Sequence, residues 1–444
     1  MKSKKYKHNL KKSHIKLIEQ LNKKYSNKIP LNELFNDTPN VINSDSWFSI
    51  SKSDNFNKDN LLSFNNNINK DKLIKCKKVI LLPSNEQKLI LLKMLEAYRI
   101  MYNRTINTIR KRWFNNERTN INFQYLRTYI LKSEKDDLIK QFNVPSHMLD
   151  GAIKLACASY KSAFTNFKQG NIKKFQINYL KNSKKSHIFD IEKCSFNKNT
   201  FYSTFLGKIM LNNENYDYSN INKDSKLHYN VVSKRFTLLI PIDINEKNST
   251  DNNDYISIDP GIRTFLTCLT NSDTIEINKE TNNNIGGIIT KIDKITDLNN
   301  IRNKKFAIRK RSLKIQNKIQ DLHWKSINYL MKRNEKHILI GNWSTKQCIS
   351  RCGNLNKLTK RISSRLSYYQ FLQRLKFKCN EYNKDLHIVD EKYTSKLCSN
   401  CCIENETLGS SKIFNCKNCN LCLDRDINSC RNICIKSFSK KFNV

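Results

Sequence analysis

Hydrophobic and polar positions change their period several times along the chain, and each change predicts a new element. From Lys77 onward, "KKVILLPSNEQKLILLKMLEAYRIMYNRTI" has a short apolar run and then apolar residues at helical spacing, which predicts a strand followed by a helix. Ser84 and Gln87 fit a capping box at the start of that helix. Another apolar stripe at helical spacing, between Pro145 and Gln169, predicts a further helix. A folded region therefore begins close to residue 76.

Beyond residue 172 the period of the apolar positions shifts toward two, as in "KKFQINYL" and "RFTLLIPI", with Asn- and Lys-rich turns between the runs. This period is typical of strands. We therefore expect a β module made of residues 76–83 and 173–245, with a helical insert over residues 84–172. Residues 1–75 have few apolar positions, so we expect them to form a basic and flexible N-terminal extension.

A polar segment, residues 243–254, separates this region from a second pattern. "YISIDPGIRTFLTCLTN" and "DTIEINKE" predict three strands joined by tight turns. A long basic helix is expected from about Gly287 to Lys336, followed by the buried strand "HILIGNW", a helix, the strand "DLHIVDE", a cysteine-rich insert and a closing helix. The order βββ-α-β-α-β-insert-α is that of an α/β, RNase H-like fold. We expect such a domain over residues 255–444.

The cysteine-rich insert predicts a metal centre. Fifteen cysteines in a reducing compartment indicate metal ligands rather than disulfides, and two C-x-x-C pairs separated by fourteen residues are typical of a Cys₄ zinc ribbon. The predicted ligands are Cys398, Cys401, Cys416 and Cys419. Because cysteine fills all four tetrahedral positions, we expect a structural Zn²⁺ in a ribbon over about residues 394–423. Cys402 and Cys422 are expected to be bystanders, with Cys422 as the alternative to Cys419.

Charge adds a partner to this picture. The chain has 80 Lys and Arg against 39 Asp and Glu, a formal charge of +41, and such an excess favours a polyanionic partner. An AT-rich coding sequence would account for the lysines but not for the shortage of acids. We therefore expect nucleic-acid binding, with residues 76–245 as a recognition region, and no small-molecule substrate.

The hydropathy of the chain bears on where it works. No run of eighteen apolar residues occurs, and the first twenty residues are basic rather than apolar. A membrane span and a secretory signal are therefore not expected, and we expect the protein inside the cell, in the nucleus or the cytoplasm of its host.

Carboxylates on the predicted domain indicate a second kind of metal site. Asp259 ends a buried strand, and Asp426 opens the closing helix, which the fold order brings toward the central strands. A phosphodiester nuclease needs two or three carboxylates, because Mg²⁺ prefers oxygen ligands and a pair of ions contacts the attacking and leaving oxygens. The two acids therefore predict a magnesium-dependent catalytic site.

Several motifs resemble one known family. "SIDPGIRTFLT", "EKYTSKLCSNCC", "CKNC" and "DRDINSCRNI" are similar to the RuvC-like nuclease core and zinc ribbon of the TnpB transposon-encoded proteins and of their eukaryotic and giant-virus relatives, the Fanzor proteins. The resemblance extends over about residues 76–440. It implies an RNA-guided DNA endonuclease, with a guide RNA, a DNA target and a short protein-read motif beside that target. By motif, Asp259 and Asp426 are two of three catalytic carboxylates, and Asp424 is a neighbour that contributes a hydrogen bond.

The third carboxylate departs from the bacterial pattern. The acid that ends the strand corresponding to "HILIGNW" is replaced here by Gly341. In the Fanzor-like arrangement a glutamate just before "YTS" supplies it, which implies Glu391. Side chains alternate along a strand, so Asp390 and Glu391 face opposite ways and only one can reach the metals, and we favour Glu391. Two alternatives follow from Gly341 and from the family: a nucleic-acid-binding regulator that does not cleave, or a transposase that acts directly in recombination.

Overall fold

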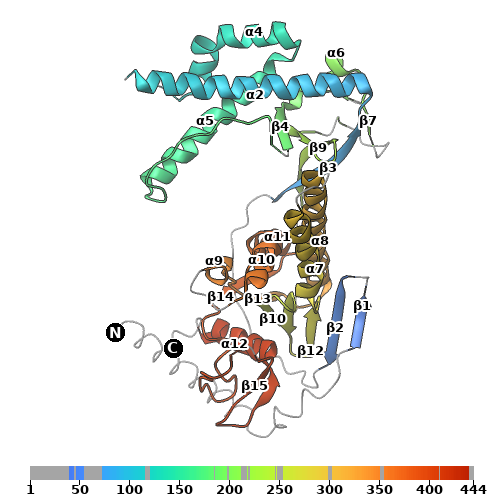
Figure 1. Cartoon of the computed structure of the whole chain (residues 1–444), viewed down its shortest axis with the longest axis vertical. Helices are drawn as coiled ribbons and strands as arrows, with labels where there is room; N and C mark the ends of the chain where they lie inside the picture. The colour runs from blue at the N-terminus through green and yellow to red at the C-terminus, as the bar shows by residue number, and fades with distance from the viewer. Residues whose placement is uncertain are drawn as a thin grey trace. The chain divides into compact units, whose positions relative to one another are not determined.

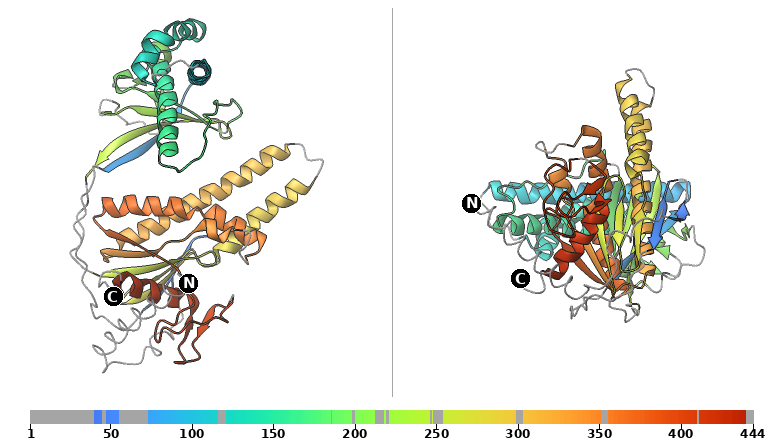
Figure 2. Two further views of the ribbon diagram at one scale, coloured as in Figure 1. Left: turned by 90° about the vertical axis from the view of Figure 1, so that its left-hand side faces the viewer. Right: turned by 90° about the horizontal axis from the view of Figure 1, so that it is seen from below.

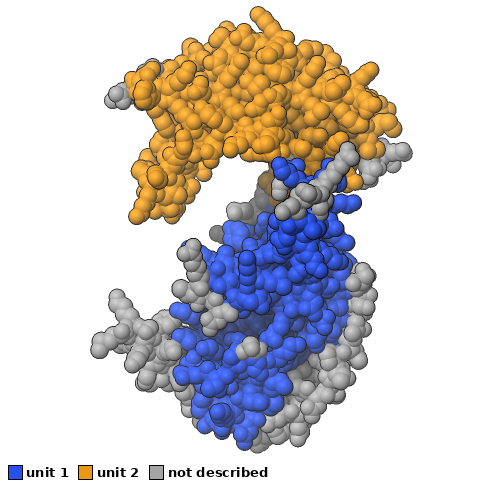
Figure 3. All heavy atoms as spheres, in the orientation of Figure 1, with its two compact units in different colours: residues 1–73, 245–444 blue, residues 74–244 orange. Residues whose placement is uncertain are grey.

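The computed structural model divides the chain into two compact units, which Figure 1 shows as ribbons and Figure 3 as spheres. Unit 2 comprises residues 74–244, and unit 1 comprises residues 1–73 and 245–444. The described residues are 40–44, 47–54, 73–115, 121–184, 186–197, 200–211, 218, 221–245, 247, 254–298, 303–350, 355–409 and 411–439. Unit 2 therefore interrupts unit 1 in the sequence.

Unit 2 combines a helical group with a five-stranded sheet of order β4-β8-β9-β3-β7. Its strands are β3 (Leu73–Leu82), β4 (Ser186–Ile191), β7 (Met210–Leu211), β8 (Ser225–Asn230) and β9 (Arg235–Ile244), and a short pair is formed by β5 (Phe196–Asn197) and β6 (Thr200–Phe201). Its α-helices are α2 (Asn85–Phe114), α3 (Phe123–Tyr125), α4 (Lys132–Phe142), α5 (Ser146–Lys168) and α6 (Ser203–Leu206).

The start of α2 follows the capping pattern of its sequence. The Ser84 hydroxyl accepts a hydrogen bond from the Gln87 amide at 3.2 Å, and the Gln87 side chain accepts one from the Ser84 amide at 2.9 Å. The predicted capping box is thereby confirmed. Further along α2, residues at helical spacing point into the core, among them Leu91, Tyr98 and Met101, each at most 2% exposed.

The central sheet of unit 1 has seven strands, in the order β1-β2-β12-β11-β10-β13-β14. They are β1 (Asn40–Ser44), β2 (Ser49–Asp54), β10 (Tyr255–Pro260), β11 (Leu266–Leu269), β12 (Asp273–Ile277), β13 (His337–Gly341) and β14 (Asp385–Val389). The pairs β10–β13 and β13–β14 are parallel, and the pairs from β10 to β1 are antiparallel. The carboxyl ends of β10, β13 and β14 therefore meet at one edge.

Helices cover both faces of this sheet (Figure 2). One face packs in a large apolar core against α7 (Thr281–Asp297), α8 (Lys304–Lys332), α10 (Lys357–Leu366) and α11 (Tyr368–Glu381). The other face packs against α12 (Arg425–Ser439), through Ile433, Cys434 and Phe438. A short helix, α9 (Thr345–Cys348), follows β13, and the small hairpin of β15 (Ile413–Asn415) and β16 (Cys422–Asp424) precedes α12.

Two predicted helices are each divided in the structure. The stretch expected as one helix over residues 287–336 forms α7 and α8, which pack against each other, and Asn303 at the start of α8 has a φ of 65°. A residue in the left-handed conformation cannot continue a helix, so α8 begins only after Asn303, and asparagine tolerates that conformation. Ser367, with a φ of 53°, likewise separates α10 from α11. In the described part of the chain, no helix is long and apolar enough to cross a membrane.

The N-terminal hairpin of β1 and β2 adds two strands to the sheet. It lies within residues 1–75, which were expected to be flexible; most of that segment, residues 1–39 and 55–72, is outside the described residues. Strand β2 pairs antiparallel with β12, and Phe48 and Ile50 are buried in the core of unit 1, 2% and 3% exposed. The extended segment is thus stabilised by a sheet edge and a core that lie far away in the sequence.

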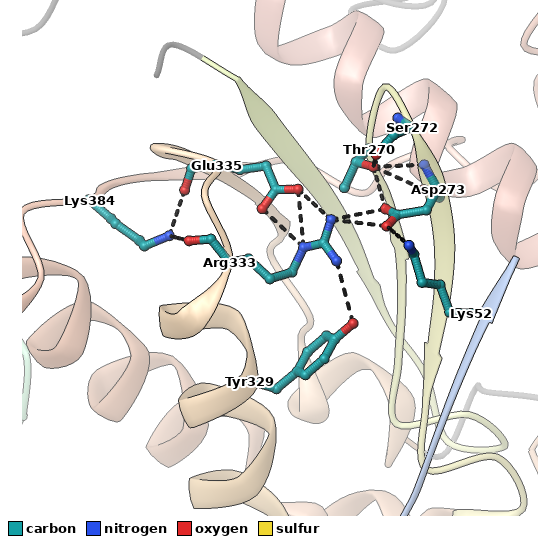
Figure 4. A network of polar contacts seen from close by, with 8 residues as sticks. All are labelled: Lys52, Thr270, Ser272, Asp273, Tyr329, Arg333, Glu335 and Lys384. Atoms are coloured by element: carbon teal, nitrogen blue, oxygen red, sulfur yellow. Dashed lines mark hydrogen bonds and ion pairs between the residues drawn. The ribbon is translucent and has the colours of Figure 1, made fainter. Parts of the chain in front are cut away.

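A buried ion-pair network joins this hairpin to the rest of the sheet (Figure 4). Asp273, 1% exposed at the start of β12, pairs with Lys52 of β2 at 3.1 Å and accepts hydrogen bonds from the Arg333 guanidinium at 3.0 and 3.1 Å. Arg333 also donates to Glu335, and Lys384 donates to the carbonyl oxygens of both of these residues. Because each buried charge has a partner, the network fixes the hairpin without leaving an unpaired ion.

Replacing Phe48 with alanine is expected to destabilise unit 1 by about 3–5 kcal/mol, because the substitution opens a cavity under the edge of the sheet. Phe306 is the matched control, since it belongs to the same unit but is 56% exposed, and Phe306→Ala should change stability by about 0.5 kcal/mol or less. Denaturant unfolding of both full-length variants checks this. Equal effects of the two substitutions would show that the hairpin contributes nothing to the core.

Candidate active site and metal centre

Four cysteine side chains meet at one point in unit 1. They are Cys398, Cys401, Cys416 and Cys419, whose sulfur atoms all lie within 4.8 Å of one another. The Sγ atoms of Cys398 and Cys419 are 3.5 Å apart, and those of Cys401 and Cys416 are 3.4 Å apart. A tetrahedral zinc with sulfur ligands at about 2.3 Å would need sulfur–sulfur distances of about 3.8 Å. The residues therefore fit a structural Zn²⁺.

The surroundings of the cluster separate ligands from bystanders. The second cysteine pair lies between the strands β15 and β16 of the small hairpin that precedes α12. Leu408, Phe414 and Leu421 pack around the sulfurs. Cys422 is exposed on β16 and Cys402 is buried, and neither belongs to the cluster. Although burial raises the pKa of Cys416, backbone amides of Cys419 and Asn418 lower it to about 7. This favours the thiolate that a zinc ligand needs.

The purified chain is expected to contain one zinc ion that is lost on Cys398→Ser and retained on Cys422→Ser. Zinc binding to such ribbons contributes about 10–16 kcal/mol near neutral pH, so loss of one sulfur should also unfold the hairpin. Elemental analysis of both variants measures the zinc content. A full complement of zinc in the Cys398→Ser protein would exclude this cluster as the site.

Three acidic side chains come together where the carboxyl ends of the parallel strands meet. Asp259 lies on β10, Asp426 lies in the first turn of α12, and Glu391 lies two residues after the end of β14. Asp426 and Glu391 both raise the pKa of Asp259 through their charge. Asp390, in contrast, is exposed. The Asp426 amide donates a hydrogen bond to Asp424 Oδ1 at 2.7 Å, which is the contact expected of Asp424.

Burial and neighbouring acidic side chains disfavour ionisation of all three acids. Burial raises the pKa of Asp259 well above its usual range, with Asp426 and Glu391 adding to it, and a Ser429 hydrogen bond lowers it only in part. Burial and the Asp390 charge raise the pKa of Glu391 to about 7. Burial and Asp424 raise that of Asp426. A cation bound between the carboxylates would remove this repulsion.

The carboxylate of Glu391 occupies the space beside Gly341. A Cβ atom added to Gly341 would lie 2.3 Å from Glu391 Oε1 and 2.7 Å from its Cγ, far inside contact distance. Among the described residues, Oε1 of Glu391 is buried and has no hydrogen-bond partner. A buried acceptor without a donor is costly, and a hard cation such as Mg²⁺ would satisfy it. The glycine at the end of β13 thus makes room for an acid from the segment that follows the neighbouring strand β14.

Stacked aromatic rings pack against the turn that follows Asp259. Phe265 lies between Tyr368 and His323, with ring centroids 5.2 and 5.6 Å apart and interplanar angles of 15° and 17°. The Tyr368 hydroxyl donates to the carbonyl oxygens of Gly261 and Phe265. Burial, and the charges of Glu391 and Asp259, raise the pKa of Tyr368 far above its usual range, so it remains a neutral donor. Tyr368 therefore fixes the backbone next to the acidic cluster.

Sequence reasoning missed the polar side chains of α12 that organise this region. Ser429 donates its hydrogen bond to Asp259, and Asn428 and Asn432, both fully buried, bond to the backbone that follows Glu391. Their signal in the sequence is a four-residue spacing of asparagines within the closing helix. Buried amides at that spacing indicate a specific partner, but not which one.

These residues form a mixed α/β unit with a four-cysteine centre and an acidic cluster. Comparison with known proteins shows which class of protein has this combination. Residues 368–433 match the family model "Cas12f1-like, TNB domain", which spans α11, β14, the cysteine cluster and the start of α12. The protein is therefore one with a Cas12f1-like TNB domain. Since it is also 32% identical to a TnpB-like protein over 88% of its length, it belongs to the TnpB-like family.

Curated relatives establish that membership. Two TnpB-like proteins of Acanthamoeba polyphaga mimivirus are 32% and 33% identical to this chain over 435 and 382 residues. The alignments cover 88% and 81% of this chain, and 82% and 72% of the two relatives.

Solved structures show a weaker likeness. A cryo-EM structure of the Cas12f1–sgRNA–target DNA complex is 13% identical, covers 79% of this chain and 83% of that one, and has a TM-score of 0.46. The structure of the mini-RNA-guided endonuclease CRISPR-Cas_phi3 is 8% identical, covers 83% and 93%, and has a TM-score of 0.45.

Proposed function

We propose that this protein is a transposon-associated, RNA-guided DNA endonuclease whose catalytic residues are Asp259, Glu391 and Asp426. The observation that carries the proposal is the crowding of these three acids. Each has a raised pKa, and Asp259 responds to the charges of both of the others. Holding three like charges close together destabilises a folded protein. A site that binds divalent cations would explain why the three acids lie together.

The strand order supports an RNase H-like, RuvC-like domain. Numbered from β10, the five strands from β12 to β14 have the order 3-2-1-4-5, with antiparallel pairs on one side of β10 and parallel pairs on the other. The acids lie at the carboxyl end of the parallel strands, where open α/β sheets bind ligands. The zinc ribbon lies between β14 and α12 in the sequence, and so between Glu391 and Asp426.

The chemistry follows from the three carboxylates. Asp259, Glu391 and Asp426 would hold two Mg²⁺ ions through oxygen ligands. Asp259 is the acid whose pKa both of the others raise. Bound Mg²⁺ would supply Lewis-acid stabilisation of the attacking and leaving oxygens of a phosphodiester, leaving a 5′-phosphate. Tyr368 would keep the turn after Asp259 in place during the reaction.

Charge supports nucleic acid as the partner, both as guide RNA and as DNA target. The formal charge of +41 suits a polyanion, and part of the excess lies on α8. Exposed basic residues of that helix are Lys305, Arg309, Lys310, Lys314 and Lys332. Membership of the TnpB-like family supports association with a transposon.

Two measurements on the full-length protein test this function. Sequencing of copurifying RNA should find one discrete species, and protein with that RNA and Mg²⁺ should cut a matched DNA target. Asp259→Asn should abolish cutting without weakening target binding. Cutting by the Asp259→Asn protein would refute the site. Binding without cutting, with Mg²⁺ and with Mn²⁺, would favour the non-cleaving regulator, and joining of transposon-end DNA would favour a transposase.

A further inference from the structure

One face of α12 holds the segment that runs from Glu391 to the first zinc ligands. Asn428, Asn432 and Lys436 recur every four residues along the helix and are 0%, 0% and 4% exposed. Residues four apart lie one above the other on a helix, so the three side chains form a single stripe. We call it the polar stripe of α12. The same helix carries Asp426 in its first turn.

Asn428, the first residue of the polar stripe, bonds to the backbone on both sides of the zinc ligand Cys398, a segment that we call the zinc knuckle (residues 397–399). The Asn428 amide nitrogen donates to the Leu397 carbonyl oxygen at 2.7 Å, and its oxygen accepts from the Ser399 amide at 3.0 Å. Leu397 and Ser399 are the two neighbours of Cys398, a member of the cysteine cluster. The position of Cys398 is therefore set on both sides by one buried side chain of α12.

Lys436, the last residue of the polar stripe, bonds to the backbone around Glu391. The Lys436 ammonium donates to the carbonyl oxygens of Asp390, at 3.1 Å, and of Lys392. These residues are the two neighbours of Glu391. The Thr394 hydroxyl and amide both donate to the Glu391 carbonyl oxygen, at 2.9 and 3.1 Å. The backbone around Glu391 is thus held by hydrogen bonds on both sides, as the backbone around Cys398 is.

Asn432 joins the two ends. Its amide nitrogen donates to the Thr394 carbonyl oxygen and to the Leu397 carbonyl oxygen, both at 2.7 Å. Thr394 holds Glu391, and Leu397 precedes Cys398, so one buried amide connects the carboxylate segment with the zinc knuckle. Buried backbone carbonyls that lose such a donor pay their full desolvation cost. Disorder at one end of the segment is therefore transmitted to the other.

We propose that Asn428 and Asn432 are positioning residues that couple zinc binding at the cysteine cluster to divalent-cation binding at Asp259, Glu391 and Asp426. The inference rests on the proposed function of the acidic cluster. Zinc binding orders the zinc knuckle, the polar stripe carries that order to Glu391, and the carboxylate is presented to the cation. Such coupling is reciprocal, so a cation at the acids also tightens zinc binding.

The experiment measures Mn²⁺ binding by electron paramagnetic resonance on the full-length protein, with zinc bound and after removal of zinc and chelator. The wild-type protein is expected to bind Mn²⁺ about tenfold or more tightly with zinc bound, within the usual range of such couplings. Two variants remove the donor: Asn432→Ala and the nearly isosteric Asn432→Asp. In both, the ratio of the Mn²⁺ affinities with and without zinc should fall close to one, although the variants still bind zinc. Asn428→Ala should lower both the ratio and the zinc affinity.

A control variant and a measurement without substitutions complete the test. Asn405 bonds to Asn415 within the ribbon at 3.0 Å, so Asn405→Ala perturbs the ribbon and should leave the ratio unchanged. Hydrogen exchange on the wild-type protein should show that zinc removal accelerates exchange of the amides from Glu391 to Ser399 but not of those in β10. An unchanged ratio in the Asn432 variants, or no change in exchange near Glu391, overturns the coupling.

Failure of the proposed function would look different. Asp259→Asn should abolish the Mn²⁺ binding itself, whatever the zinc content. If Mn²⁺ binding survives that substitution, the acidic cluster is not the cation site and the proposed function fails. If it is lost there, yet the ratio is the same in the wild-type and Asn432 proteins, only the coupling fails.

Discussion

DNA cleavage that is lost in Glu391→Ala is expected to return when a glutamate is placed at Gly341 in the same chain. The carboxylate of Glu391 lies where a side chain of Gly341 would begin, 2.3 Å from the position of its Cβ. Loss of one metal-binding carboxylate costs several kcal/mol of transition-state stabilisation, or about 10³-fold in rate. The Gly341→Glu, Glu391→Ala double variant should recover most of that loss. Single-turnover cleavage with Mg²⁺ measures it.

The single variant Gly341→Glu provides the control for this exchange. With Glu391 present, a new side chain at Gly341 also lies 2.7 Å from its Cγ and 2.9 Å from its Cδ, so one of the two must move. We expect less activity than in the wild-type protein, not more. A double variant that is folded and binds DNA, but cleaves no faster than Glu391→Ala, would show that the two positions are not equivalent.

Glu391→Gln is expected to stabilise the metal-free protein at pH 8 by about 3 kcal/mol and to change little at pH 4.5 or below. Burial, with Asp390, raises the pKa of Glu391 from 4.5 to about 7, so the folded state binds the extra proton. For a raised carboxyl pKa, stability is highest below the unfolded value and falls as the pH rises through the folded value. At 1.36 kcal/mol per pKa unit, the loss between pH 4.5 and 7 is about 3 kcal/mol.

Urea unfolding of the full-length protein between pH 4.5 and 8 measures this difference. Glu406, an exposed glutamate of the same unit, supplies the control substitution Glu406→Gln, which should have no such pH profile. Mg²⁺ should reverse the order of stability above pH 7, because it binds the wild-type carboxylate and not the amide. A stability difference that is equal at pH 4.5 and pH 8 would contradict a raised pKa at Glu391.

The parts of the site that sequence could predict are those with local signals. The cysteine pairs have a fixed spacing, and Asp259 and Asp426 lie at an element boundary that the hydrophobic period reveals. Glu391 was favoured over Asp390 by resemblance and by strand alternation. In the structure β14 ends at Val389, so alternation does not apply there, and loop hydrogen bonds orient the two acids instead. The role of Glu391 as a metal ligand stays a prediction.

The parts that sequence could not predict depend on distant partners. Phe48 and Ile50 alternate for only a few residues in a polar segment, and their burial comes from β12 and α8, far along the chain. The polar stripe of α12 could not be predicted either, because an asparagine in a helix does not indicate a buried contact until the carbonyl that it bonds to is known. The close approach of Glu391 to Gly341 joins two strand ends that only the finished sheet brings together.

The place of the hairpin in the sequence also orders events in time. Strand β2 is made early, but its partner β12 follows only after all of unit 2, more than two hundred residues later. At about 5–20 residues per second, the hairpin would wait about 10–40 s on the ribosome before its edge exists. Unit 2 can fold as an uninterrupted segment during that interval, whereas unit 1 can close only after β14 and α12 have been made. The acidic cluster is therefore assembled last, once Asp426 has emerged and α12 can dock.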